Sequence, residues 1–110
     1  MEDEILRENA KRFLKSAQLI YQTKDYTSST ILYFKCLFAI LDLKIFEKLR
    51  RTPKDHTERF RILEASFFDF YESLDKIYSI YRNAYNLIIS KEDCDRVKKD
   101  VERIAKEQGI

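Results

Sequence analysis

The chain has 110 residues with 21 basic and 19 acidic side chains, so its formal net charge is only +2. This length corresponds to one domain over residues 1–110, and the balanced charge does not by itself indicate nucleic-acid binding. With one glycine and one proline, the chain lacks the turn residues that a sandwich, a barrel or an α/β domain requires. The composition therefore predicts an all-α fold, and the lone glycine excludes a glycine-rich phosphate-binding loop.

The first two helices are predicted over residues 3–23 and from residue 26 or 28 to residue 50. The first has apolar residues at the spacing of one buried face, whereas the second is apolar on nearly every side. Such a helix is either central in its own bundle or shared with a second subunit. Because a bundle this small surrounds no helix completely, we expect a homodimer; the alternative is a monomer in which this helix contacts every other. The expected interface comprises Tyr33, Phe34, Leu37, Phe38, Leu41 and Phe68.

Pro53 disfavours helix at Thr52 and so indicates a loop after the second helix. A short third helix is predicted around residues 60–63, and a longer fourth helix over residues 67–85 has the most regular apolar spacing in the chain. Its aromatic stripe favours a place in the core, although stacking on nucleic-acid bases is a second interpretation.

A short extended stretch is predicted at residues 87–89. Ser90 with Asp93 resembles a capping box that opens a fifth helix, and Gly109 is placed to end it. These elements predict an up-and-down antiparallel bundle of four long helices plus one short helix. The most apolar run, Ile31 to Leu41, is shorter than the about 20 residues that a membrane span requires.

The order of these motifs resembles the HEPN superfamily, small helical-bundle domains of archaea and bacteria. A helix pair is followed by a Pro-Lys-Asp-His loop at residues 53–56, and the long aromatic helix ends in Tyr-Arg-Asn-Ala-Tyr-Asn at residues 81–86. The sequence Ser-Lys-Glu-Asp at residues 90–93 then leads into a charged final helix. The similarity covers about residues 8–107.

The resemblance implies a bundle of four or five helices, often dimeric and frequently paired with a minimal nucleotidyltransferase. Many members are metal-independent endoribonucleases of toxin–antitoxin systems, and they use an Arg followed, after a short spacer, by a His near the end of the long helix. In this chain Leu-Ile-Ile stands in that window after Arg82, and no histidine follows His56. The resemblance therefore implies the bundle without that active site.

His56 is the only side chain whose ordinary pKa suits general acid–base work at neutral pH. Arg51, five residues earlier, can supply a cation for the charge that develops during RNA cleavage. The candidate catalytic pair is thus Arg51 and His56, while a structural hydrogen bond near a helix start is the favoured role for the imidazole. Ligand contact is a third possibility.

Basic residues cluster between the second and third helices, and a further one lies near the end of the fourth. They are interpreted either as a solvated surface or as a phosphate-binding patch for a nucleotide or RNA. For Arg82 we favour structural pairing with Glu64 or Asp75 over ligand binding. The candidate ligand-binding residues are Arg50, Arg51, Lys54, His56, Arg59, Arg82 and Asn83.

One histidine and two cysteines without a CxxC pair do not make a structural zinc site, so no metal or cofactor is expected. Few cysteines and the lack of a signal sequence suit a reducing, cytoplasmic location. The sequence thus predicts a non-catalytic HEPN-like interaction module, a partner of a minimal nucleotidyltransferase that binds nucleotide or RNA. The alternatives are a divergent endoribonuclease that uses Arg51 and His56, and a structural adaptor without a nucleotide ligand.

Overall fold

The computed structural model describes all 110 residues and contains five helices and no strand. The all-α prediction is confirmed. The helices are α1 (Glu2–Gln22), α2 (Tyr26–Leu49), α3 (His56–Ser66), α4 (Phe68–Asn83) and α5 (Lys91–Glu107). No helix is both long enough and apolar enough to cross a membrane.

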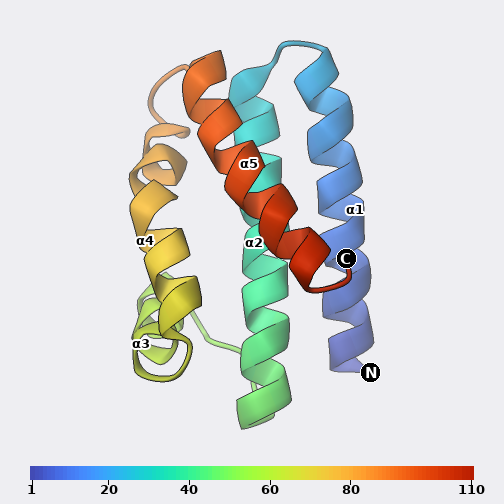
Figure 1. Ribbon diagram of the computed structural model, residues 1–110, viewed down its shortest axis with the longest axis vertical. Coiled ribbons are helices and arrows are strands. Elements are labelled where there is room, and N and C mark those ends of the chain that lie inside the picture. The colour runs from blue at the N-terminus through green and yellow to red at the C-terminus, as the bar shows by residue number, and fades with distance from the viewer.

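The second helix, α2, lies at the centre of the molecule. Figure 1 shows α1 and α2 side by side and antiparallel, with α5 crossing α2 obliquely so that its C-terminal end lies towards α1. α4 lies on the other side of α2, and the short α3 lies near the N-terminal end of α4. α2 is therefore in contact with each of the other four helices.

The burial of α2 corrects the predicted subunit interface. Twelve α2 residues are buried within the single chain, which explains why this helix is apolar on nearly every side. Of its large apolar side chains only Leu49, at the end, is exposed. The argument that an all-round apolar helix needs a second subunit does not hold for α2, because the other four helices cover it within one chain. The predicted interface residues Tyr33, Phe34, Leu37, Phe38 and Leu41 are all less than 10% exposed, and only Phe68 is open to solvent.

Three helices begin at a side chain that caps them. Asp25 accepts a hydrogen bond from the Ser28 backbone N–H, Asp55 from that of Glu58, and Ser90 from that of Asp93. Each bond satisfies one of the free N–H groups of a first helical turn. The Ser90 cap was predicted from the sequence, and it is confirmed.

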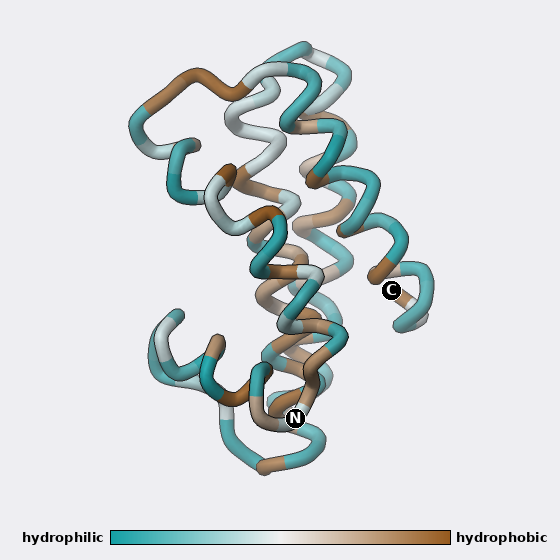
Figure 2. Tube along the Cα trace, turned by 60° about the vertical axis from the view of Figure 1, so that its left-hand side comes forward, coloured by the Kyte–Doolittle hydropathy of each residue, from teal (hydrophilic) through white to brown (hydrophobic).

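The connection between α4 and α5 is apolar, and Figure 2 shows it as a hydrophobic stretch at the edge of the molecule. Ile89 is buried, and its backbone N–H donates to Thr27 Oγ1 at 2.9 Å. Leu87 and Ile88 are exposed, Ile88 almost completely at 94%. The loop is thus fixed to the start of α2 through Ile89, while its two other apolar side chains project into solvent.

Candidate functional site

An arginine, a histidine and an aspartate form a connected polar unit between α2 and α3. Arg59 donates through Nε and Nη2 to the two carboxylate oxygens of Asp42, at 2.7 and 3.0 Å. Its Nη1 lies 2.6 Å from Nδ1 of His56. Arg59 is only 8% exposed, so these bonds satisfy a charge that is largely excluded from water.

Local structure places these side chains together. Asp55 caps α3, so that His56 is its first helical residue, and Arg59 follows one turn later on the same face. Asp42 projects from α2 towards this face and is the only acidic residue between Ile31 and Phe46. The sequence analysis missed Asp42. The signal was present, because a lone carboxylate in an apolar helix needs a buried partner.

Aromatic rings surround the imidazole of His56. Its ring centroid lies 4.8 Å from that of Phe38, 5.5 Å from Tyr81 and 5.9 Å from Tyr78. The Arg59 guanidinium carbon lies 4.7 Å from the centre of the Phe38 ring. Burial lowers the pKa of His56 below its ordinary value, and the adjacent Arg59 charge lowers it further. The imidazole is therefore held in its neutral form at neutral pH.

The contact with Arg59 also fixes the tautomer of His56. A guanidinium has only donors, so Nδ1 must accept, and the single proton of the neutral ring is on Nε2. Proton uptake at Nδ1 would break this bond and place two cations side by side. His56 is thus a hydrogen-bond acceptor for Arg59, with one N–H left to donate, and is poorly arranged as a general base.

Arg51, the expected partner of His56, is engaged elsewhere. Its Nη1 lies 2.9 Å from Glu58 Oε1, and the Lys54 backbone N–H donates to the same oxygen at 3.0 Å. The hydrogen bond from Lys54, together with Arg51, lowers the pKa of Glu58. The structure therefore brings His56 to Arg59 and Arg51 to Glu58, and no bond joins Arg51 to His56.

The remaining candidates are exposed. Arg50 ends α2 in a left-handed conformation with φ of 59°, and neither Arg50 nor the ammonium group of Lys54 forms an ion pair. Arg82 has no carboxylate partner, so the pairing with Glu64 or Asp75 expected from the sequence is absent; its guanidinium carbon lies 5.9 Å from the Tyr78 ring centre. The Asn83 carbonyl accepts the backbone N–H groups of the turn that follows α4.

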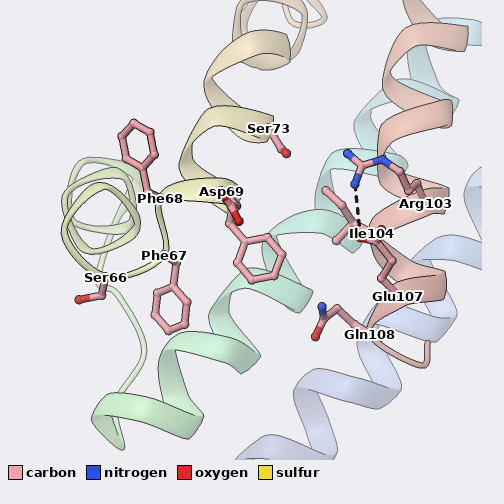
Figure 3. Close-up of a pocket in the computed structure, with 10 residues that line it drawn as sticks. Ser66, Phe67, Phe68, Asp69, Ser73, Arg103, Ile104, Glu107 and Gln108 are labelled. Atoms are coloured by element: carbon pink, nitrogen blue, oxygen red, sulfur yellow. Dashed lines mark hydrogen bonds and ion pairs between the residues drawn. The ribbon is translucent and has the colours of Figure 1, made fainter.

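A separate open groove of about 740 Å³ lies between the start of α4 and the end of α5. Figure 3 shows Asp69 and Ser73 on one side and Arg103 and Glu107, which pair with each other, on the other. Of the residues predicted to be functional, only Phe68 lines this groove. No three His, Cys, Asp or Glu side chains come together in an arrangement that could hold a metal ion.

Comparison with protein-family models, with curated proteins and with solved structures found no match to this chain. Two features of the structure bear on function: the hydrogen-bonded His56–Arg59–Asp42 unit, and the exposed cations that lie outside it.

Proposed function

We propose that this chain is a non-catalytic, cytoplasmic HEPN-like module whose helices form an up-and-down antiparallel bundle of four long helices and one short helix. It binds the phosphate groups of a nucleotide or RNA and acts beside a small nucleotidyltransferase. The observation that carries the proposal is the contact between Arg59 Nη1 and His56 Nδ1, because it engages the one side chain suited to acid–base catalysis. A homodimer through α2 forms no part of the proposal, since the residues it would use are buried.

Phosphate binding is supported by the surplus of free cations around the loop between α2 and α3. Residues 48–61 contain six basic and two acidic side chains. Arg51 and Arg59 have carboxylate partners. The others are exposed and form no ion pair with a carboxylate: Lys48, Arg50, Lys54 and Arg61. A local excess of exposed cationic side chains without ion pairs attracts phosphates, and binding releases the counterions that accompany them.

The binding arm of the proposal is tested by fluorescence anisotropy with a labelled single-stranded RNA at several salt concentrations. Affinity is expected to fall steeply as salt rises. The double variant Arg50→Gln/Lys54→Gln should bind more weakly and with a shallower salt dependence. The matched control, Lys11→Gln/Lys15→Gln, removes two exposed cations of α1 that also lack ion pairs, and should bind as the unchanged protein does. Affinity that is independent of salt, or equal losses in both variants, overturns the proposal.

The non-catalytic arm is tested on the same samples by following the length of the RNA on a gel. The expected result is intact RNA with the unchanged protein and with His56→Gln, whose side-chain carbonyl can still accept from Arg59. RNA that is cut by the unchanged protein and spared by His56→Gln contradicts the proposal. That result would favour the endoribonuclease alternative, in which His56 acts with Arg51.

A further inference from the structure

Aromatic side chains of α3 and α4, together with Tyr85 just after α4, form a continuous ladder along the outer side of the molecule. Successive ring centroids in this aromatic ladder lie between 4.7 and 6.1 Å apart. The residues that α4 buries are aliphatic instead, namely Leu74, Ile77 and Ile80. The sequence-based assignment of the aromatic stripe to the core holds for Phe67, Phe70, Tyr71, Tyr78 and Tyr81, which pack against the core while partly exposed, but not for Tyr85, which is open to solvent. The ladder comprises, in order, Phe68, Tyr71, Phe60, Tyr78, Tyr81 and Tyr85.

The ladder ends in an exposed ring on each side, but the charges around its two halves differ. Phe68 is 54% exposed and Tyr85 is 60% exposed. Near Phe68, the negative charge of Glu64 raises the pKa of Tyr71, aided by burial and by Asp75. In the other half, burial raises the pKa of Tyr78, and the positive charges of Arg59 and Arg82 oppose that rise. The carboxylates of Glu64 and Asp75 thus make the Phe68 half less favourable for a polyanion than the Tyr85 half, where Arg82 has no carboxylate partner.

The Tyr85 end is also rigid. The rings of Tyr81 and Tyr85 meet edge to face at 86°, with centroids 5.3 Å apart, and their hydroxyl oxygens lie 3.1 Å apart. Tyr81 in turn packs on the buried ring of Phe38 and on His56, which belongs to the polar unit with Arg59 and Asp42. Tyr85 therefore presents an open ring from a supported base, so that a ligand that stacks on it loses little side-chain freedom.

We infer that Tyr85, supported by Tyr81 and close in the chain to Arg82, whose guanidinium lies over the Tyr78 ring without a carboxylate partner, is a stacking site for the bases of a single-stranded nucleic acid. The inference rests on the proposed function and specifies where the bases, rather than the phosphates alone, are bound. Every base has a face that stacks on an aromatic ring, so recognition at this site is tolerant of sequence. Arg82 supplies the cation for the adjoining phosphate.

The test is fluorescence anisotropy of the full chain with two labelled probes, a short oligouridylate and an oligomer of equal length made of abasic nucleotides. Tyr85→Ala should bind oligouridylate about tenfold more weakly, the loss expected for one stacked base. Tyr85→Phe keeps the ring and should bind as the unchanged protein does. The matched control is Phe68→Ala, which removes an equally exposed ring at the acidic end and should leave the affinity unchanged.

The abasic probe separates this inference from the proposed function. The inference expects the unchanged protein to bind oligouridylate more tightly than the abasic probe, and Tyr85→Ala to bind the two equally. Equal binding of both probes by the unchanged protein, with Tyr85→Ala unaffected, overturns the stacking site and leaves phosphate binding standing. If Tyr85→Ala and Phe68→Ala lose the same affinity for oligouridylate, the placement of the stacking site at Tyr85 is overturned. Binding of neither probe overturns the proposed function and the inference with it.

Discussion

The behaviour of His56 is set by Arg59, and that of Arg59 by Asp42. A guanidinium that is largely excluded from water needs an anion, and Asp42 supplies two parallel hydrogen bonds. The remaining guanidinium nitrogen, Nη1, then donates to Nδ1 of His56, which is the only acceptor on the neutral ring. A histidine that looks catalytic in the sequence is in this way turned into a structural acceptor.

Replacing Asp42 by Ala leaves the Arg59 charge without its partner. We expect this change to lower the free energy of unfolding by about 3 kcal/mol, since the pair is mostly buried. Urea denaturation followed by far-UV circular dichroism measures the loss. The control is Arg51→Ala, which breaks the more exposed pair with Glu58 and should cost less than about 1 kcal/mol. Equal losses in the two variants would show that the Asp42–Arg59 pair is not structural.

The lowered pKa of His56 predicts a pH dependence of stability. The unfolded chain binds a proton at about the ordinary pKa of 6.5, whereas the folded chain resists protonation until a lower pH. The stabilisation is therefore complete above the unfolded-state pKa of about 6.5 and is lost as the pH falls from there through the folded-state pKa. Urea midpoints measured between pH 7.5 and about pH 5 should fall on acidification. Because the chain has a single histidine, His56→Gln removes its only imidazole and should flatten this dependence, and an unaltered slope contradicts the assignment.

The start of α5 was the helix end that could be predicted most directly. Ser90 and Asp93 stand at the spacing of a cap, and that information is local. The pairing of Asp42 with Arg59 could not be predicted in the same way, because the two lie 17 residues apart and meet only when α3 folds back against α2. The exposure of Tyr85 was not predicted for a related reason: aromatic and aliphatic residues are interspersed along α4, and spacing alone does not say which of them meet the core.

The connection between α4 and α5 allows a test with neighbouring residues of the same type. Ile89 is 5% exposed and Ile88 is 94% exposed. Ile89→Ala should lower the free energy of unfolding by about 2 kcal/mol or more, because it leaves a cavity where the loop is fixed. Ile88→Ala should change it by less than about 0.5 kcal/mol. Chemical denaturation measures the free energy of unfolding of both variants. Similar losses of stability in the two would contradict the burial of Ile89 and the exposure of Ile88 described for this loop.

At the scale of the whole molecule, the fold is complete within one chain. α2 is covered by the other four helices, and the apolar excess that suggested a second subunit serves as the common core. The error in that prediction lay in the geometry of a small bundle: α5 crosses α2 obliquely, and α3 and α4 close another side. Composition alone identified the all-α class, because one glycine and one proline are too few for the many tight turns of a β or α/β fold.

A self-contained fold predicts that stability does not depend on protein concentration. The urea midpoint should be the same over about a hundredfold range of concentration, because no association contributes to the unfolding equilibrium. Sedimentation at each concentration reports the species present. A midpoint that rises with concentration would show instead that a second copy is part of the folded state.

The most direct test of the central claim is the protonation state of His56 itself. Because the chain has one histidine, nitrogen-15 NMR of the imidazole gives one unambiguous pair of ring signals. At neutral pH we predict a neutral ring with its proton on Nε2 and with Nδ1 as an acceptor from Arg59, unchanged when RNA is added. A proton on Nδ1, or a ring that is already charged at neutral pH, would contradict the claim that His56 is a structural acceptor without catalytic work.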